Sequence, residues 1–234
     1  METTKNIIKQ HDIKHIAIIM DGNRRWAKER SLPSAIGHKK GVDALKTTLK
    51  AFDEFGIKYL TVYAFSTENW NRKPDEVNFL MDLLANTLKN ELDEMNQNNV
   101  VISFIGNISQ LNTNLQQILN NAVEKTKNNT GVHLQIAFNY GARAEIVNAI
   151  NKIIDAKETN ITEDIFEKYL YTKNIPDPEI LIRTGGEMRI SNYLLWQIAY
   201  SELIIIPDYW PDFNQESLIN CIKEFASRSR RFGK

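Results

Sequence analysis

The stretch HIAIIMDGNRRWAKE, residues 15–29, joins a short apolar run to a turn containing glycine and then to a segment of helical composition. Its run Ile16–Met20 is continuously apolar, which is typical of a parallel strand covered on both faces. Arg24 and Arg25 follow where a helix begins, although helix starts usually favour acidic side chains. The pattern has two equal interpretations: an anionic ligand binds at this turn, or the turn is only capped and its arginines are solvated.

The same pattern repeats along the chain, because short β-rich runs alternate with longer segments of helical period. The expected strands are Ile16–Met20, Tyr59–Phe65, Val100–Ile105, Val132–Phe138, Ile180–Arg183 and Leu203–Ile206. The expected helices after the first turn cover about residues 42–55, 74–95, 109–126, 143–154, 162–170, 191–200 and 214–230. This alternation predicts a single α/β domain with a mostly parallel six-stranded sheet flanked by helices, and an active site at the carboxyl ends of the strands.

The composition limits the function classes. The chain has 234 residues, enough for one sizeable core, and its 29 lysines and arginines balance its 29 aspartates and glutamates. No global field attracts nucleic acid, so any positive site must be local. No apolar run approaches the ~20 residues of a membrane span, and the single cysteine, Cys221, excludes an intrachain disulfide and is expected in the core. We expect a cytoplasmic protein with at most peripheral membrane contact.

The turn after the first strand has the residue types of a phosphate site. Gly22 allows close approach of a ligand to the backbone, Asn23 can cap the next helix, and the free N–H groups of that helix can hold a phosphate. Asp21 would repel a phosphate directly, but it can hold a Mg²⁺ ion that the phosphate also ligates.

Two further strand ends carry arginines in polar loops. The loop at residues 66–74, with Trp70 and Arg72, can close over a ligand or simply cap the helix that begins at proline. Arg183 ends the fifth strand, and a double glycine, Arg189 and Ser191 follow it. Two arginines and a hydroxyl around a glycine turn favour a second phosphate site, because arginine pairs two donors with two phosphate oxygens. The alternative for this second loop is a surface turn paired to Glu187.

Other residues offer weaker signals. Glu202, directly before the last strand, is either a second carboxylate for a metal or a solvated cap. Walker, dinucleotide-binding, nucleophile-elbow and zinc-binding patterns do not occur in the sequence. Leu80, Met81, Leu84, Leu88 and Leu92, with Leu45, Leu49 and Phe52, form apolar stripes that can pack in the core or line a hydrophobic tunnel.

Five motifs in fixed order carry a resemblance to a known family: HIAIIMDGNRRWA, GHKKG, YAFSTENWNR, RTGGEMRISNYLLWQIAYSE and PDYWPDF. They closely resemble the cis-prenyltransferases, and within that family the bacterial undecaprenyl diphosphate synthases. The resemblance extends from about residue 15 to residue 233. It implies a catalytic domain over residues 15–234 and a leader segment over residues 1–14.

The resemblance implies Mg²⁺-dependent, repeated condensation of isopentenyl diphosphate onto farnesyl diphosphate by a homodimer. The product would be a long polyprenyl diphosphate, such as the undecaprenyl carrier lipid of cell-wall glycans. Asp21 would be the catalytic aspartate that assists the metal and the leaving diphosphate, with Glu202 near the metal. The ending Arg231–Phe232–Gly233 resembles a motif that reaches the site of the partner subunit.

The resemblance also distributes the remaining site residues. The allylic diphosphate site is expected at Gly22, Asn23, Arg24, Arg25, Trp26 and His38. The isopentenyl diphosphate site is expected at Arg183, Arg189 and Ser191. The mobile loop is expected at Ser66, Glu68, Asn69, Trp70 and Arg72, with Asn69 in a catalytic role. Many relatives have an arginine where this chain has Ser34, and Arg24 and Arg30 are the candidates to replace it.

Three questions stay open at this stage. The base that removes the proton can be Asp21, the departing diphosphate or a relayed water. A non-catalytic accessory subunit of a prenyltransferase complex is one rival interpretation of the whole chain. A phosphohydrolase with Asp21 as its nucleophile is another.

Overall fold

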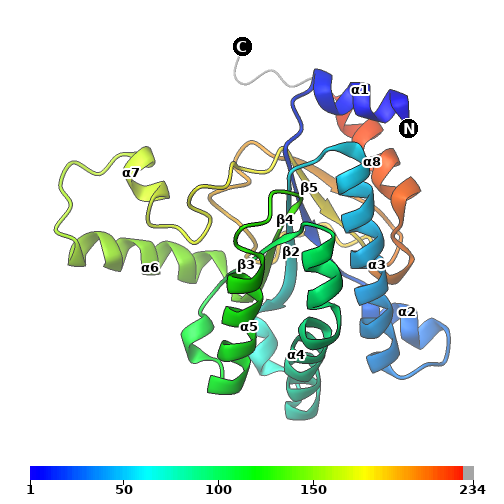
Figure 1. The fold of residues 1–234 in the computed structure, drawn as a ribbon, viewed down its shortest axis with the longest axis horizontal. Coiled ribbons are helices and arrows are strands. Elements are labelled where there is room, and N and C mark those ends of the chain that lie inside the picture. Colours follow the sequence, from blue (N-terminus) through cyan, green and yellow to red (C-terminus); the bar gives the residue numbers. More distant parts are fainter. Residues whose placement is uncertain (229–234) are drawn as a thin grey trace.

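The computed structural model describes residues 1–228, and within them the strands form one six-stranded parallel sheet of order β3-β4-β2-β1-β5-β6 (Figure 1). The strands are β1 (His15–Ile19), β2 (Tyr59–Ser66), β3 (Val101–Ile105), β4 (His133–Tyr140), β5 (Ile180–Arg183) and β6 (Glu202–Ile205). Each lies within two residues of its expected bounds. The predicted α/β fold with a parallel sheet is therefore confirmed.

The helices connect the strands and end at local signals. They are α1 (Glu2–Gln10), α2 (Asn23–Glu29), α3 (Ser34–Phe55), α4 (Pro74–Gln97), α5 (Thr113–Thr126), α6 (Ala142–Asp155), α7 (Glu163–Glu167) and α8 (Gln215–Ser227). Short 3-10 helices are η1 (Thr67–Asn71), η2 (Ile108–Gln110) and η3 (Trp210–Asp212). Proline opens α4 at its first turn, and the Asn214 side chain accepts hydrogen bonds from the first N–H groups of α8.

The helix expected over residues 191–200 is wrong. Ser191, Asn192 and Leu194 have φ values of 50°, 61° and 46°, so the backbone enters the left-handed region three times and forms successive turns. Tyr193 and Leu194 are fully buried against the sheet. The apolar residues of this segment are spaced as in a helix, but they pack against the sheet from an irregular backbone. The same segment carries part of the candidate site.

The N-terminal residues contain a helix that the motifs did not predict. Helix α1 lies beside α8 in Figure 1, and its Ile8 side chain is buried in the main core. The chain division at residue 15 stays a prediction.

The two faces of the sheet are covered differently. One face packs against α1, α3, α4, α5 and α8, whose apolar side chains form the main core. Cys221 of α8 is a buried free cysteine within it, as expected. The other face is covered by the start of α6 and the irregular segment at residues 190–198, while α6 and α7 project to the left in Figure 1.

An irregularity near the end of β2 shapes the main face. The pairing of β2 with β4 shifts register on both sides of Phe65. Strict alternation would place Phe65 on the same face as Tyr63, but the shift turns it into the main core while Tyr63 stays on the other face. The main face therefore gains an aromatic side chain close to the carboxyl edge of the sheet.

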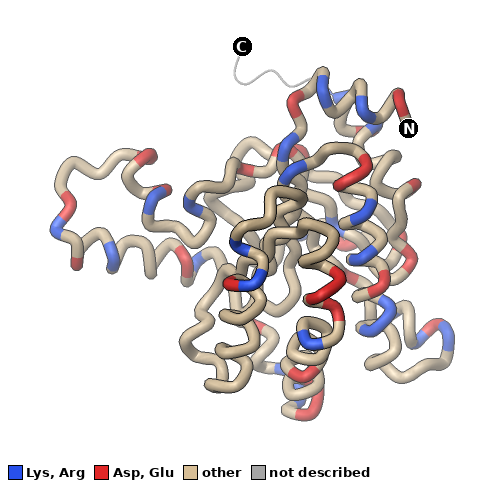
Figure 2. Tube along the Cα trace, viewed as in Figure 1, with Lys and Arg blue, Asp and Glu red and all other residues tan. Residues whose placement is uncertain are grey.

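Charged residues of both signs are interspersed along the chain (Figure 2), in agreement with the zero formal net charge. Among residues 1–228, no helix has the length and the apolar content needed to cross a bilayer.

Candidate active site

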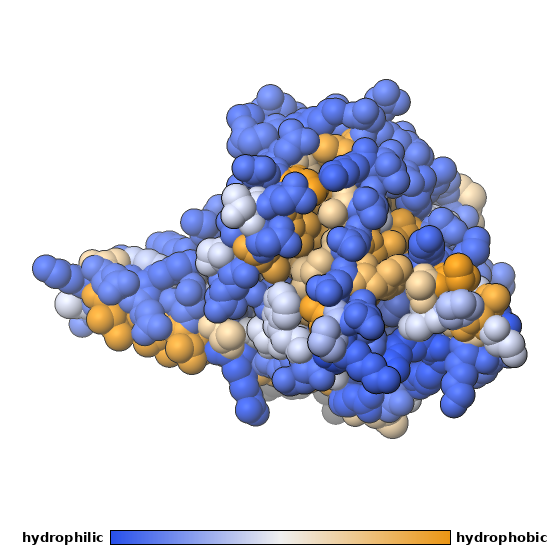
Figure 3. Space-filling model, turned by 90° about the horizontal axis from the view of Figure 1, so that it is seen from below, coloured by the Kyte–Doolittle hydropathy of each residue, from blue (hydrophilic) through white to orange (hydrophobic). Residues whose placement is uncertain are grey.

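A cavity of about 930 Å³ lies between α3, α4 and the main face of the sheet and opens at the carboxyl ends of the strands. Its interior is apolar, with side chains from both helices and from β2 and β4: Leu45, Val62, Phe65, Leu80, Leu83, Leu84, Leu88, Met95, Leu134, Ile136 and Phe138. Figure 3 looks toward this edge and shows apolar atoms at its centre surrounded by hydrophilic ones. The cavity is of the size usual for ligand sites.

The predicted apolar stripes divide between this cavity and the core. Leu45, Leu80, Leu84 and Leu88 line the cavity, whereas Met81, Leu92, Leu49 and Phe52 do not. On α4 the lining extends from Leu80 to Met95, which corresponds to a depth of ~22 Å at 1.5 Å per residue. The tunnel prediction is therefore right for half of the residues named for it.

Basic side chains outnumber acidic ones at the mouth of the cavity, although Glu76 and Glu187 form ion pairs with four of them. The described residues that line it include six with positive charge, Arg24, Arg25, Lys28, Arg72, Arg183 and Arg189, and a single acid, Asp21. Lys28 was not among the expected site residues; it lies one helical turn after Arg24, so helical spacing could have identified it. A chain of zero net charge thus concentrates positive charge at one edge of its sheet, where it favours an anionic ligand.

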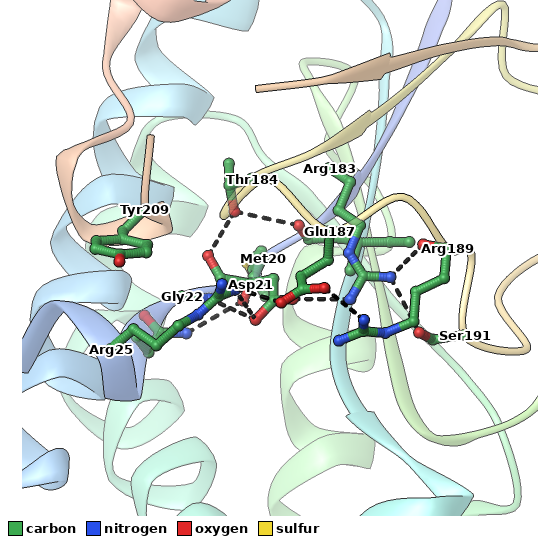
Figure 4. Close-up of polar contacts among 12 residues, drawn as sticks. Met20, Asp21, Gly22, Arg25, Arg183, Thr184, Glu187, Arg189, Ser191 and Tyr209 are labelled. Atoms are coloured by element: carbon green, nitrogen blue, oxygen red, sulfur yellow. Dashed lines mark hydrogen bonds and ion pairs between the residues drawn. The ribbon is translucent and has the colours of Figure 1, made fainter. Parts of the chain in front are cut away.

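Asp21 lies at the centre of this rim (Figure 4). Its Oδ2 accepts a hydrogen bond from Nη2 of Arg183 at 2.8 Å, and its Oδ1 lies 3.3 Å from Nη2 of Arg25. Its backbone carbonyl accepts from the Thr184 hydroxyl at 2.7 Å, which ties β1 to β5. Burial alone would raise the pKa of Asp21, but Arg183 and Arg25 outweigh it and hold the pKa below its usual value. The carboxylate is therefore ionised at neutral pH.

The second arginine cluster adjoins the first. Nη1 of Arg183 donates to Oγ of Ser191 at 3.0 Å and also to the carbonyl of Arg189. The Arg189 side chain pairs with Glu187 at 2.6 Å, and Arg25 pairs with the same carboxylate at 3.2 Å. The turn therefore forms the ion pair with Glu187 that a surface turn would have. It also brings together Arg25, Arg183 and Arg189, as a second phosphate site requires.

Helix α2 is held against η3, which explains the motif PDYWPDF. Gly22 has φ 104°, and a Cβ there would lie 2.5 Å from the Tyr209 ring. Nε1 of Trp26 donates to Asp212 at 2.6 Å, and the Arg30 guanidinium stacks 4.3 Å from the Trp26 ring. Trp26 is buried and does not line the cavity, so the structure does not place it where the expected contact with a diphosphate requires it. Arg30 is likewise turned away from the cavity, which leaves Arg24 as the candidate to replace the missing arginine near Ser34.

Several buried polar atoms at the mouth have no partner within residues 1–228: Oδ1 of Asn23, Nε2 of His38 and Nε of Arg183. Asn23 is the first residue of α2 and its side chain donates to the Met20 carbonyl, so the expected helix cap is wrong. Burial and the nearby Arg72 lower the pKa of His38 to about 4, so its ring is neutral at pH 7. Unsatisfied buried groups of this kind are rare, so these polar atoms are candidates to contact water or a ligand at the mouth.

The loop after β2 is only partly at the cavity. Ser66, Asn69 and Arg72 line it. The other two loop residues point elsewhere: Trp70 donates through Nε1 to Asn139 at 2.8 Å, and Glu68 accepts from Asn192 at 2.9 Å.

Glu202 does not lie with Asp21. In the parallel register Glu202 pairs with Ile180 and Ile205 pairs with Arg183, so Glu202 is at the opposite edge of the sheet, ~10 Å before the level of Arg183. It forms an ion pair with Arg228 at 2.9 Å. The expected metal shared by Asp21 and Glu202 is therefore wrong within one chain, because Glu202 is the first residue of β6 whereas Asp21 follows the last residue of β1, and these positions lie at opposite ends of a parallel sheet. The tail residues Arg231 and Gly233 lie outside the described residues.

The fold and the cavity define a protein that can hold an anionic head group at a cationic rim and a long apolar tail in its interior. The profile of the family described as "Putative undecaprenyl diphosphate synthase" matches residues 19–233. The chain belongs to this family of prenyltransferases, which are enzymes.

Individual relatives agree with this family. The chain is 52% identical over 226 residues to an isoprenyl transferase of Clostridium tetani, covering 94% of this chain and 89% of the relative. It is 48% identical over 226 residues to a ditrans,polycis-undecaprenyl-diphosphate synthase ((2E,6E)-farnesyl-diphosphate specific) of Micrococcus luteus, covering 94% and 91%.

Solved structures are similar over nearly their whole length. Lavandulyl diphosphate synthase from Lavandula x intermedia, in complex with dimethylallyl diphosphate, has a TM-score of 0.90 at 35% identity, covering 95% of this chain and 98% of that one. A probable undecaprenyl diphosphate synthase from Campylobacter jejuni has a TM-score of 0.83 at 33% identity, covering 95% and 99%.

Proposed function

We propose that this prenyltransferase extends farnesyl diphosphate by repeated condensation with isopentenyl diphosphate, forming cis double bonds and a long polyprenyl diphosphate such as undecaprenyl diphosphate. The observation that carries the proposal is the cavity itself, whose mouth has six cations around one carboxylate and whose depth is apolar. An amphiphile with a diphosphate head and a hydrocarbon tail has the matching chemistry. The names of the Micrococcus and Lavandula proteins support allylic diphosphates as the class of donor.

Two diphosphates would bind side by side at this rim. Gly22, Asn23, Arg25 and His38 would hold the allylic diphosphate, and the unpartnered atoms of Asn23 and His38 support this assignment. Arg183, Arg189 and Ser191 would hold isopentenyl diphosphate. Asp21 lies between the two groups, hydrogen-bonded to Arg183 and paired with Arg25. Anchoring both head groups holds the isopentenyl double bond near the allylic carbon, which replaces a bimolecular encounter.

In each cycle a carbon–carbon bond forms, the allylic carbon–oxygen bond breaks to release diphosphate, and the adduct loses a proton. Negative charge accumulates on the leaving diphosphate, so catalysis depends on groups already oriented toward it. Arg25 and the side chains at the start of α2 would stabilise that charge. Asn69, whose Oδ1 accepts from the Ser66 N–H at 3.1 Å, would keep the neighbouring loop in place.

The residues at the mouth fit a magnesium ion that arrives with the substrate. Asp21 is the one carboxylate among the described cavity residues, and no cluster of three potential ligands occurs within residues 1–228. Mg²⁺ typically binds one or two carboxylates together with substrate phosphates, so one ionised aspartate is a sufficient protein ligand. When bound, the ion would supply positive charge to the leaving diphosphate.

The decisive experiment is incubation of the purified chain with farnesyl diphosphate, excess isopentenyl diphosphate and Mg²⁺, followed by sizing of the products. We expect polyprenyl diphosphates, and far less product from Asp21→Ala. The accessory-subunit alternative is not favoured, because the arginines and Asp21 are assembled at the cavity. Absence of product from the purified chain would favour the accessory subunit. Phosphate release without isopentenyl diphosphate would indicate a phosphohydrolase.

The apolar interior would hold the growing chain, so a bulky substitution should limit the product length, and more strongly the nearer it lies to the mouth. Leu84 and Leu88 line the cavity at successive positions on α4. Leu88→Trp should shorten the product, and Leu84→Trp, nearer the mouth, should shorten it more. The same length from both variants would contradict growth along α4.

We also propose a cytoplasmic homodimer that supplies a carrier lipid for cell-wall glycans, with at most peripheral membrane contact. An exposed apolar stripe on α6 supports an interface: Val147, Ile150 and Ile154 are 58%, 45% and 65% exposed. Ile154→Lys should shift the mass measured by light scattering toward the monomer. An unchanged mass would remove α6 from the interface.

A further inference from the structure

A hydrogen bond joins the two loops that approach the cavity mouth from different strands. Nδ2 of Asn192, in the segment after β5, donates to Oε1 of Glu68 in η1, after β2, at 2.9 Å. The two residues are 124 positions apart in the sequence. Neither of them lines the cavity, so neither is in direct reach of a bound head group.

Each partner is close in sequence to residues that do line the cavity. Ser191 precedes Asn192, lines the mouth and accepts a hydrogen bond from Arg183. On the other loop, Ser66 and Asn69 flank Glu68, and both line the mouth. The Asn192–Glu68 bond therefore bridges the residues of the second diphosphate site and those of the loop beside the first.

Asn192 is held rigidly in this position. It has φ 61°, a left-handed conformation that asparagine tolerates better than most residues. Its Oδ1 accepts from the Arg143 N–H at 2.9 Å, and its carbonyl accepts from the Ala142 N–H at 2.9 Å. The amide group is thereby oriented so that its Nδ2 donates toward Glu68.

The junction is also tightly packed. A Cβ on Gly141 would lie 2.5 Å from the Thr67 hydroxyl and 2.8 Å from Nδ2 of Asn192. A displacement of Asn192 would therefore also displace the residues of η1. Burial would raise the pKa of Glu68, but the hydrogen bond from Asn192 and others outweigh it and leave the pKa below its usual value, so the acceptor is ionised at neutral pH. Hydrogen bonds to an ionised acceptor are the stronger kind.

We propose that Glu68 and Asn192 are positioning residues that couple occupancy of the second diphosphate site to the position of the loop Ser66–Arg72. The proposal rests on the two-site function given above. A diphosphate on Arg189 and Ser191 would order the segment that carries Asn192, and the hydrogen bond would transmit this order to Glu68 and to the cavity residues on either side of it. Coupling of this kind is reciprocal, so the loop position would equally set affinity at the second site.

The test exchanges the donor and the acceptor of the hydrogen bond between Asn192 and Glu68. Asn192→Asp places a carboxylate against Glu68 and breaks the bond by repulsion. Adding Glu68→Gln restores a bond, because the glutamine amide can donate to the new aspartate, and the total charge then equals that of the wild type. Glu68→Gln alone is the matched control, since its amide oxygen still accepts from Asn192.

Loop position can be read without catalysis. Trp70 lies in η1 beyond Glu68 and is 44% exposed, so its fluorescence reports the environment of the loop. The probe is inorganic pyrophosphate. The Trp70→Phe variant retains the other three tryptophans, so subtracting its response from that of the wild type isolates the Trp70 signal. Arg189→Ala identifies the part of the response that comes from the second site.

We expect pyrophosphate to change the Trp70 signal in the wild type, with a response that Arg189→Ala reduces. Asn192→Asp should shift the midpoint about tenfold to higher pyrophosphate and raise the Michaelis constant for isopentenyl diphosphate by a similar factor, the value of one hydrogen bond to a charged group. The double variant should recover to within about threefold, and Glu68→Gln alone should stay in that range.

Other outcomes have distinct meanings. Absence of a wild-type signal, an undiminished response in Asn192→Asp, or a double variant no better than that single variant would each overturn the coupling. A response that follows the expected order in a chain that forms no polyprenyl product would support the link and refute the proposed function. Far-UV circular dichroism checks that the variants are folded.

Discussion

Replacing Arg183 by alanine should affect both stability and isopentenyl diphosphate binding, whereas replacing Arg189 should affect binding alone. The Arg183 side chain is 6% exposed and donates to Asp21, to Ser191 and to the Arg189 carbonyl. The Arg189 side chain is 59% exposed, and within residues 1–228 it pairs with Glu187. Both arginines are proposed to bind the same ligand. In the free protein, however, Arg183 links Asp21 to the turn after β5, whereas the Arg189 side chain pairs with a partly exposed carboxylate.

The magnitude follows from what each substitution leaves behind. Removing one partner of a fully buried ion pair costs ~3–5 kcal/mol, because the other charge is left uncompensated. Asp21 is 28% exposed and keeps Arg25, so we expect Arg183→Ala to lower the free energy of unfolding by ~2 kcal/mol. Arg189→Ala should stay within ~0.5 kcal/mol of the wild type, as exposed surface substitutions do. Each lost diphosphate contact should lower kcat/KM about a hundredfold, which corresponds to ~3 kcal/mol.

Urea unfolding at pH 7, followed by circular dichroism, gives the two stability changes, and initial rates at saturating farnesyl diphosphate give the Michaelis constant for isopentenyl diphosphate. Arg183→Lys serves as a further comparison, because lysine keeps the charge and loses the paired donors. Equal unfolding free energies for the two alanine variants would refute the structural role assigned to Arg183. A Michaelis constant for farnesyl diphosphate that rises as much as that for isopentenyl diphosphate would refute the assignment of the two sites.

The remaining predictions concern the rim and the pH dependence. Asp21→Ala should fold, bind both diphosphates and lose most turnover; normal turnover at saturating Mg²⁺ would contradict the metal role. Arg24→Ala should weaken farnesyl diphosphate binding measured by calorimetry, whereas Arg30→Ala should not, and equal affinities for both variants would remove Arg24 from the site. Burial lowers the pKa of His15 to about 4, below its ordinary 6.5, so its contribution to stability is complete above pH 6.5 and is lost as the pH falls. At pH 5 the loss should be ~2 kcal/mol, and His15→Gln should flatten that part of the stability profile; an unchanged slope would contradict this origin.

The strands and the edge of the sheet that carries the site were predictable from local sequence. Continuous apolar runs identify buried parallel strands, and each of the six lies close to its expected bounds. The carboxyl ends of parallel strands share one edge, so residues that follow β1 and β5 were expected to meet there. Asp21, Arg25, Arg183 and Arg189 do meet there, although their catalytic roles stay predictions.

Only the tertiary structure decided which neighbours each side chain faces. Helical spacing identified an apolar stripe on α4, but it could not separate Leu88, which lines the cavity, from Leu92, which packs in the core. The same spacing over residues 191–200 predicted a helix, where contacts with the sheet instead stabilise three left-handed residues. Trp26 was assigned to a ligand and instead contacts Asp212, 186 residues away in the chain. Sequence periodicity sets which residues share a face, whereas the partner of that face depends on contacts between segments far apart in the chain.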